Sequence, residues 1–446
     1  GWLDHLQPAW SHGPLLPLQI TLRHFGQSEW CDGSAAGLWN FVAETLTAQG
    51  LADFAPYLRQ LLLDGGVLVL LDGLDEVADP EQRKAVLEAV ADFAATYGHP
   101  ANRTLVTCRG YAYRDPCWQL ESFADHTLAP FRQEQIDAFI DCWYTEVCRL
   151  GWKSEAEAED LTRRLQRATR RPDLAPLAGS PLQLTMMASL HFSWGRLPGD
   201  RVELYQEMVR LLLVRWQEAR LGEEVGVTQA VSASRLESAL EQVAFEAHHA
   251  QGEGEGTADI SEETLRRVLK DYLEGSWDRA GELVSYIQQR AGLLLERGPG
   301  VYTFPHRSYQ EYLAGAYLAV QPGFPDEAAA LIGENSGQWR EVVLWAVGVM
   351  ARLKKMTHVA VDATAALCPG EVPTGAVAES AWRAAQLAGE ALLEIGVEEV
   401  QARERHREVL ARVRRWLVAL LRKGALDVRE RAEAGNVLGR LGDPRF

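Results

Sequence analysis

The stretch Val67-Leu-Val-Leu-Leu-Asp-Gly-Leu-Asp-Glu76 decides the fold of this chain. Its first five residues are all apolar and predict a strand buried on both faces of a parallel sheet. Three carboxylates follow, Asp72, Asp75 and Glu76. Open α/β sheets bind ligands at the carboxyl ends of their strands, where acids can hold Mg²⁺ and orient the water that attacks a nucleotide. An ordinary polar turn needs only one of these acids, so the stretch favours a nucleotide-hydrolysing site.

The surrounding residues predict a parallel α/β sheet. Apolar residues recur at helical spacing from Val86 to Tyr97, and Arg103–Arg109 predicts a second short buried strand that ends on a cation. Leu16–Leu22 and Thr127–Phe131 predict two further strands, and strands that alternate with helices form parallel sheets. Arg109 is then expected beside the acids, where it can sense a γ-phosphate. Taken alone, it has the alternative of being an ordinary surface arginine.

Composition narrows the possible partners. A chain of 446 residues allows two to four domains, and 45 Lys and Arg against 62 Asp and Glu give a net charge of −17. This balance argues against nucleic acid as the main partner. A basic cluster at 163–171 is either a solvated helix face or a phosphate or partner contact. No apolar run approaches the ~20 residues of a membrane span, and the six cysteines lack metal-ligand spacing, which suits a cytoplasmic protein.

Five segments occur in an order known from one protein family. They are Leu70–Glu76, Thr104–Arg109, Leu177–Leu184, Leu197–Tyr205 and Phe304–Ala314. In turn they resemble the extended Walker B motif, the sensor-1 strand, the stretch whose proline packs on adenine, the start of the winged-helix domain and that domain's histidine-containing signature in the NACHT ATPases. This branch of the signal-transducing, AAA-like STAND NTPases includes the animal NOD-like receptors and many bacterial immune proteins.

The resemblance implies Mg²⁺ and ATP or ADP as cofactors, and it gives six residues a role. These roles are Mg²⁺ binding by Asp72, orientation of water by Asp75 or Glu76, sensing of the γ-phosphate by Arg109, adenine contact by Pro181, and contact with the ADP β-phosphate by His306. A histidine at a helix amino terminus can donate to phosphate where the helix dipole already favours anions. The structural alternatives are that His306 is a satisfied structural residue and that Pro181 only begins a helix.

The resemblance also divides the chain into four parts: the remainder of a nucleotide-binding domain at 1–130, a helical domain at 131–196, a winged helix at 197–318 and HEAT-like helical repeats at 319–446. Leu293–Leu295 and Val301–Phe304 flank Gly298-Pro299-Gly300 and predict the two strands of the wing. Small and apolar residues recur near Ala346, Ala388 and Ala434, a spacing of helical pairs. A helical bundle without repeats is the alternative.

One motif of the family has no counterpart here. The phosphate-binding loop Gly-x-x-x-x-Gly-Lys-[Ser/Thr], whose backbone N–H groups and lysine cradle phosphates, does not occur in the sequence. Either the sequence is a fragment that begins after this loop, which we expect, or it is a degenerate NTPase. In the family the missing strand lies within the sheet, so its absence exposes strand edges. Such a fragment is expected neither to bind nucleotide tightly nor to hydrolyse it.

By resemblance, the chain is expected to act as an ATP/ADP-dependent signalling switch in bacterial immunity or stress responses. A protein trigger would bind the helical repeats, ADP would exchange for ATP, and the open form would self-associate and activate an effector. Two alternatives remain from the residues themselves. One is a non-catalytic scaffold with the same fold, and the other is a transcriptional regulator that places the winged helix on DNA.

Overall fold

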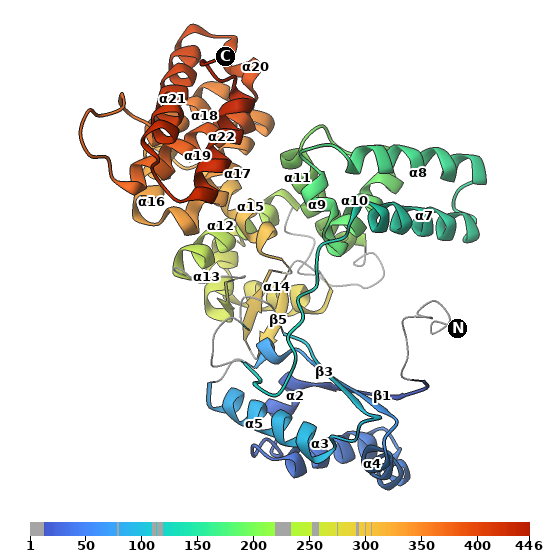
Figure 1. Ribbon diagram of the computed structural model, residues 1–446. Coiled ribbons are helices and arrows are strands. Elements are labelled where there is room, and N and C mark those ends of the chain that lie inside the picture. Colours follow the sequence, from blue (N-terminus) through green and yellow to red (C-terminus); the bar gives the residue numbers. More distant parts are fainter. Residues whose placement is uncertain are drawn as a thin grey trace. The chain divides into compact units, whose positions relative to one another are not determined.

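The computed structural model describes residues 13–77, 80–108, 113, 119–218, 233–251, 258–273, 275–290, 294–298, 300–304 and 306–446. The chain divides into two compact units. Unit 1 comprises residues 1–128 and 296–301, and unit 2 comprises residues 129–295 and 302–446. The fold is mostly helical, with one small sheet of three parallel strands and a winged-helix-like region, and each unit is described by itself below (Figure 1).

Unit 1 is built on the predicted parallel sheet. Its strands are β1 (Leu16–Thr21), β2 (Val67–Asp72) and β3 (Arg103–Val106), in the order β1-β2-β3. Between the strands run the helices α2 (Leu22–Gly26), α3 (Ala35–Ala48), α4 (Ala55–Asp64) and α5 (Pro80–Thr96), with short 3₁₀ turns at Ala52–Phe54 and Leu74–Glu76. The three strands that the sequence predicts around 16–22, 67–71 and 103–109 are thereby confirmed, as is the helix at 86–97.

Within the described residues, one face of the unit 1 sheet is fully covered and the other only in part. Val67, Val69 and Leu71 are buried, whereas Leu68 and Leu70, which alternate with them, are half-buried. Leu105, the partner of Leu70 in the register, is 55% exposed. The prediction of a strand buried on both faces was therefore wrong.

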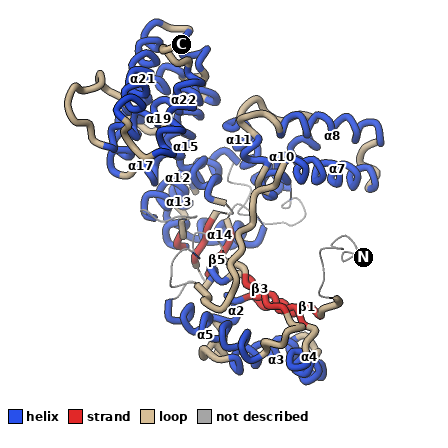
Figure 2. The backbone as a smooth tube through the Cα atoms, in the orientation of Figure 1, coloured by secondary structure: helices blue, strands red, loops and turns tan. Residues whose placement is uncertain are grey.

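The physical reason lies in the strand order. Each strand pairs with the next in sequence, and parallel crossovers are right-handed. Successive crossovers that run in one direction across a sheet place their helices on the same side. Figures 1 and 2 show α3 and α5 along one face of β1–β3. An apolar run in the sequence cannot distinguish this arrangement from a sheet that is covered twice.

The strand predicted at Thr127–Phe131 is not formed. This segment has no regular structure, and Leu128 is 98% exposed. Pro130 has no backbone N–H to donate to a strand ladder. The N–H of Phe131 instead donates to the carbonyl of Gly179 at 2.8 Å, which ties the segment to the helices of unit 2.

The described part of unit 2 is mostly helical, and residues 296–301 of the small sheet given below are grouped with unit 1. The first helices of unit 2 are α7 (Gln133–Arg149), α8 (Glu155–Thr169), α9 (Ala175–Ala178), α10 (Pro181–Trp194), α11 (Arg201–Glu218), α12 (Ala233–Gln251), α13 (Glu262–Tyr272), α14 (Trp277–Arg290) and α15 (Arg307–Ala319). Strands β4 (Ile260–Ser261), β5 (Leu295–Gly298) and β6 (Val301–Thr303) form a sheet in the order β4-β6-β5. The β5–β6 hairpin turns at Gly300, which has φ of +70°. Its second strand confirms the prediction at Val301–Phe304, whereas the first strand is Leu295–Gly298 and overlaps the predicted Leu293–Leu295 only at Leu295; residues 291–293 lie outside the described residues.

The last helices of unit 2 are α16 (Phe324–Glu334), α17 (Ser336–Gly348), α18 (Thr357–Leu367), α19 (Glu379–Ile395), α20 (Val397–Gln401), α21 (Glu404–Lys423) and α22 (Val428–Leu441), with a π-helical turn at Val349–Leu353. Ala346, Ala388 and Ala434, the residues of the spaced sequence pattern, are buried on α17, α19 and α22. Helix α19 packs against both α17 and α22. The three helices thus form a layer in which α19 is central, which leaves the HEAT-like interpretation a prediction.

Aromatic side chains fill the centre of unit 2. Tyr205 of α11 lies between Tyr309 and Tyr312 of α15 and Trp345 of α17, with ring centroids 4.6–5.6 Å apart. Gly315 allows α15 and α17 to approach, because a Cβ at this position would lie 2.6 Å from Cβ of Trp345. Such buried aromatic groups contribute both apolar area and edge-to-face contacts.

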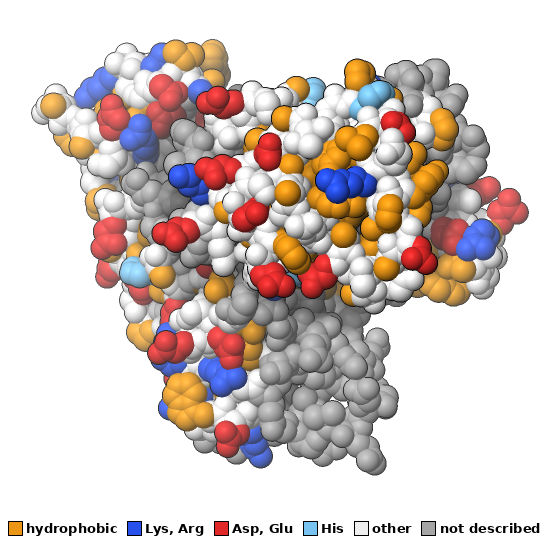
Figure 3. Space-filling model, turned by 90° about the horizontal axis from the view of Figure 1, so that it is seen from below, with side chains coloured by type: hydrophobic (Ala, Val, Ile, Leu, Met, Phe, Trp, Pro, Cys, Tyr) orange, Lys and Arg blue, Asp and Glu red, His pale blue; other side chains and the backbone are white. Residues whose placement is uncertain are grey.

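Charged side chains are dispersed over the surface. On the face seen in Figure 3, carboxylates and cations alternate with apolar side chains, so neither sign forms a continuous field there. In the basic cluster at 163–171, Arg164 pairs with Asp160, Arg170 with Asp137 and Arg171 with Asp173. These pairs favour the structural interpretation of that cluster.

Candidate functional site

The carboxyl end of β2 carries Asp72 in a turn that is fixed by the neighbouring strand. Gly73 adopts the left-handed conformation, with φ of 78° and ψ of 52°, and turns the chain into the 3₁₀ turn Leu74–Glu76. Its N–H donates to Oγ1 of Thr107 at 2.9 Å, and the Thr107 hydroxyl donates to Oδ1 of Asp72 at 2.6 Å. The N–H of Leu74 donates to the Thr107 carbonyl at 3.0 Å. Thr107, just after β3, therefore holds both the turn and the carboxylate.

This geometry suits a hard cation in part. Asp72 is exposed, and Thr107 engages one of its two oxygens, which orients the carboxylate as a second ligand shell does at metal sites. Among the side chains that the structure describes, no three His, Cys, Asp or Glu are grouped as a metal site. Mg²⁺ is commonly held by one or two carboxylates together with nucleotide phosphates and water. Asp72 fits that mode of binding and no all-protein cage.

Of the other three predicted residues, Asp75, Glu76 and Arg109, the structure describes only the side chain of Asp75. Asp75 is half-buried in the turn three residues after Asp72. Glu76 ends the same turn, but its side chain lies outside the described atoms. Arg109 also lies outside the described residues. The structure thus brings Asp72 and Asp75 into one turn and places neither the Glu76 carboxylate nor Arg109.

Pro181 is the first residue of α10, and it is exposed. Proline suits this position because its fixed φ matches the helix and its missing N–H would have no intrahelical partner. No side chain caps the first turn, although Ser180 occupies the N-cap position. This arrangement is the helix start that the structural alternative describes, and it leaves the proline ring exposed for contact with a ligand.

His306 is the N-cap residue of α15. Its Nδ1 accepts the backbone N–H of Ser308 at 3.1 Å and lies 2.7 Å from Oγ of Ser308, while the residue as a whole is exposed. An N-cap histidine satisfies one of the N–H groups that a helix leaves unpaired at its start. His306 thus has the structural role of the alternative, in a position where the helix dipole also favours anions.

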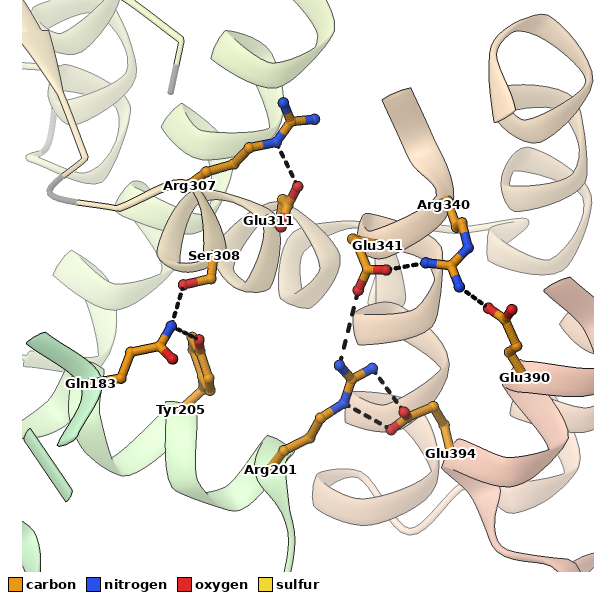
Figure 4. A network of polar contacts seen from close by, with 10 residues as sticks. All are labelled: Gln183, Arg201, Tyr205, Arg307, Ser308, Glu311, Arg340, Glu341, Glu390 and Glu394. Atoms are coloured by element: carbon orange, nitrogen blue, oxygen red, sulfur yellow. Dashed lines mark hydrogen bonds and ion pairs between the residues drawn. The ribbon is translucent and has the colours of Figure 1, made fainter. Parts of the chain in front are cut away.

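Hydrogen bonds join the first turns of α10 and α15. Nε2 of Gln183, two residues after Pro181, donates to the Tyr205 hydroxyl at 2.7 Å and to Oγ of Ser308 at 3.1 Å (Figure 4). Burial raises the pKa of Tyr205 to about 12, while hydrogen bonds with Ser308 and Gln183 oppose that shift. Pro181 and His306 therefore stand at the starts of two helices that share one polar network. Gln183 and Ser308 were not predicted as site residues.

A second network, made of charged side chains, surrounds Arg201, the first residue of α11 (Figure 4). Arg201 pairs with both oxygens of Glu394 on α19, at 2.8 and 3.2 Å, and lies 3.9 Å from Glu341 on α17. Its guanidinium also lies 4.3 Å from the ring centroid of Trp345. Burial raises the pKa of Glu394, and Arg201 opposes that shift. Arg201, Glu341 and Glu394 line a cleft of about 760 Å³ together with residues of α22.

The cleft is not an evident anion site. Four of the five arginines that line it are already engaged. Arg201 and Arg340 pair with Glu394 and Glu390, Arg171 binds Asp173 and the carbonyls of Pro198 and Gly199, and Arg352 donates to the carbonyl of Glu394. The acids that line it are as numerous as the arginines or more so. The cleft is therefore a polar junction between α11 and the last helices.

Comparison with known proteins identifies part of unit 2. The family described as the winged helix-turn-helix domain C-terminal to NACHT matches residues 201–318. A search of curated proteins found no match to the chain. None of the helices in the described part of the chain combines the length and the apolar character that a membrane crossing requires. The matched segment contains α11 to α15, the wing and His306, and it supports a NACHT-associated protein.

Proposed function

We propose that the chain belongs to a nucleotide-dependent signalling switch of the NACHT type, which cycles between a closed ADP state and an open, oligomeric ATP state. The observation that carries the proposal is the Gln183–Ser308 hydrogen bond of 3.1 Å, which joins the helix starts that carry Pro181 and His306. Two adjacent helix amino termini offer backbone N–H groups and positive dipole ends, which suit a diphosphate. The match to a NACHT-associated winged helix supports the same ligand class.

The proposed roles follow the predicted residues. Pro181 would contact adenine and His306 would donate to the β-phosphate, which keeps the module closed. Asp72, oriented by Thr107, would bind Mg²⁺ together with the phosphates of the nucleotide. Asp75 or Glu76 would orient the attacking water, and Arg109 would sense the γ-phosphate. When bound, Mg²⁺ neutralises phosphate charge and organises the attack.

Signalling would pass from the last helices to the nucleotide. We call the contacts of Pro181 and His306 with ADP the clamp. A protein trigger on the proposed HEAT-like helices, 319–446, would loosen this clamp and permit exchange of ADP for ATP. The open form would then self-associate and activate an effector. We propose a cytoplasmic setting in bacterial immunity or stress signalling. ATP hydrolysis would then set the lifetime of the active state, as a timer does.

The test is the nucleotide content of the protein purified at native length from cells. After denaturation, ion-exchange chromatography of the released small molecules should yield close to one ADP per chain for the wild type, and clearly less for His306→Ala and Asp72→Ala. Because the sequence contains no Gly-x-x-x-x-Gly-Lys-[Ser/Thr] loop, the comparison among variants carries more weight than the absolute content. Leu128→Ala serves as a matched control, since Leu128 is exposed and unstructured.

Absence of nucleotide from the folded wild type would contradict the switch and favour a non-catalytic scaffold. Equal ADP in all four proteins would retain nucleotide binding but remove His306 and Asp72 from the site. Retention of ADP that depends on His306 and not on Asp72 would confine the proposal to the clamp in unit 2.

A further inference from the structure

The side chain of Gln183 lies where α10, α11 and α15 meet, and it is almost wholly buried. Its amide nitrogen carries two hydrogens, and both are used: one is donated to the Tyr205 hydroxyl and one to Oγ of Ser308 (Figure 4). Tyr205 is buried among aromatic rings, and its raised pKa of about 12 keeps its hydroxyl neutral. The orientation of the amide is therefore fixed from the protein interior.

The direction of the Gln183 hydrogen bond determines what Ser308 does next. A serine hydroxyl has one proton to donate, and Oγ of Ser308 already accepts from Gln183. The Tyr205 hydroxyl, which also hydrogen-bonds with Ser308, can donate its own proton to Oγ, and the Ser308 proton then points to Nδ1 of His306, 2.7 Å away. The backbone N–H of Ser308 donates to the same nitrogen at 3.1 Å. With two donors facing it, Nδ1 must present its lone pair, so a neutral His306 ring carries its proton on Nε2.

We infer that Gln183 is a positioning residue, which holds the His306 ring in its Nε2–H tautomer through Ser308. The consequence of this tautomer rests on the proposed function, because an Nε2–H group can donate to a phosphate oxygen whereas a bare Nε2 would repel it. Gln183 stands two residues after Pro181, so the helix start that would contact adenine also sets the proton on the ring that would contact phosphate.

The tautomer can be measured without nucleotide. Protein labelled with ¹⁵N in the imidazole of histidine gives long-range ¹H–¹⁵N correlations that distinguish the two ring nitrogens, and His306→Gln assigns the signals of His306. In the wild type we expect the protonated nitrogen to be Nε2. Gln183→Glu keeps the shape of the side chain but replaces its donors by acceptors, so the Ser308 hydroxyl turns toward residue 183. The Nδ1-protonated population of His306 should then rise roughly tenfold, the change that one ordinary hydrogen bond produces.

Two further variants keep the test decisive if Gln183→Glu does not fold. Ser308→Ala removes the hydroxyl proton without adding a buried charge and should shift the tautomer in the same direction, whereas Ser308→Thr retains a hydroxyl and should restore the wild-type signals. Gln206→Glu adds the same charge one residue from Tyr205 and should leave His306 unchanged. Circular dichroism confirms that each variant is folded.

The outcomes separate this inference from the proposed function. A wild-type ring with its proton on Nδ1, or folded Gln183→Glu and Ser308→Ala proteins with wild-type His306 signals, would overturn the inference even if ADP binds. The expected tautomer shifts in a protein that binds no nucleotide would support the positioning role and reject the ADP site. If both hold, Gln183→Glu should also weaken ADP binding by roughly tenfold, the lower end of the loss seen when residues that orient metal ligands are mutated.

Discussion

The sheet of unit 1 and the aromatic core of unit 2 are packed in different ways. The sheet is covered by helices on one face, and its other face leaves Leu105 more than half exposed. In unit 2, Tyr205, Tyr309 and Tyr312 are almost wholly buried, together with Trp345, by helices from three parts of the chain. The candidate acids thus lie on a partly covered layer, whereas the candidate clamp is fixed by a dense core.

This difference suggests how each unit tolerates change. Side chains on an open sheet face lose little when they are truncated, while cavities in a close-packed core cost both transfer energy and contacts. Buried polar side chains are an exception to this difference. Loss of a buried hydrogen-bonding side chain can destabilise the partly covered sheet of unit 1 as much as the dense core of unit 2. Four predictions test these statements, from the largest expected effect to the smallest.

Trp345→Ala should destabilise unit 2 by about 3–5 kcal/mol, since the side chain is 2% exposed and contacts Tyr205, Tyr312 and Arg201. Leu105→Ala in unit 1 should cost less than about 1 kcal/mol because Leu105 is 55% exposed. Hydrogen exchange measured on peptides from each unit separates the two effects. A cost of several kcal/mol for Leu105→Ala would mean that the open face is covered in solution.

Asn102→Leu should destabilise unit 1 by roughly 2–3 kcal/mol, the cost of leaving buried partners unpaired. The Asn102 side chain donates to the carbonyls of Leu62 and Tyr97 at 2.7 and 3.0 Å and accepts the N–H of Val67 at 3.0 Å, which fixes the start of β2. Urea titration followed by exchange in β2 peptides measures the loss.

A matched control for this variant exists in unit 2. Asn335 is the N-cap of α17, and its side chain accepts the N–H of Gln338 at 3.1 Å. Asn335→Ala should cost about 1 kcal/mol and affect only unit 2. If Asn102→Leu is no more costly than this cap, the polar side chain does not fix β2.

Two buried histidines should lower the stability of unit 2 in acid. Burial lowers the pKa of His191 and of His248 to about 4 from an ordinary 6.5, so each is neutral in the fold. Below pH 6.5 the unfolded chain takes up protons that the folded chain does not, and stability is lost as pH falls toward 4, at up to about 1.4 kcal/mol per pH unit for each histidine.

Glu241 acts in the opposite direction. Burial raises its pKa to about 7 from 4.5, so its contribution is present below pH 4.5 and lost as pH rises through 7. Between pH 4.5 and 6.5 these three groups together contribute a slope of about 1.4 kcal/mol per pH unit, that of two histidines less one glutamate, and the raised pKa values of Glu237, Glu311 and Glu394 lower the observed slope further. Urea midpoints at several pH values measure it, and His191→Gln should flatten the slope. An unchanged slope in that variant would show that His191 titrates as it does in water.

Arg201→Lys should have the smallest effect, about 1 kcal/mol on unit 2, because the ammonium cannot make the paired contacts with Glu394 or lie flat on Trp345. The more exposed Arg340, which pairs with Glu390, is the control, and Arg340→Lys should cost less than about 0.5 kcal/mol. Equal effects in thermal unfolding would indicate that partial burial of Arg201 adds nothing to its ion pairs.

The sequence predicted the helices and strands that are determined by residues close together in the chain. The strand at β2, the helix α5 and the hairpin around Gly300 follow from apolar runs, helical spacing and turn residues. The open sheet face and the missing strand at 127–131 could not be predicted in this way, because both depend on what packs against the segment. Leu68 and Leu70 are apolar whether or not a second layer covers them.

The candidate site shows the same division. Asp72 and His306 stand in recognisable motifs, but their partners are distant in sequence. Thr107 is 35 residues from Asp72, and Gln183 is 125 residues from Ser308. A hydroxyl at the end of a neighbouring strand was a usable signal for Thr107. No feature of the residues around Gln183 points to Ser308, since only the tertiary fold brings the first turns of α10 and α15 together.

The double pairing of Arg201 has a consequence for the evolution of this protein. One guanidinium serves acids on two different helices, Glu341 on α17 and Glu394 on α19. Loss of the arginine would leave the half-buried carboxylate of Glu394 without its ion pair, whereas Glu341 would keep its pairing with Arg340, so a single substitution at position 201 or 394 is disfavoured. Among homologues, positions 201 and 394 should therefore change together or not at all, and the two residues should be traceable as one inherited pair.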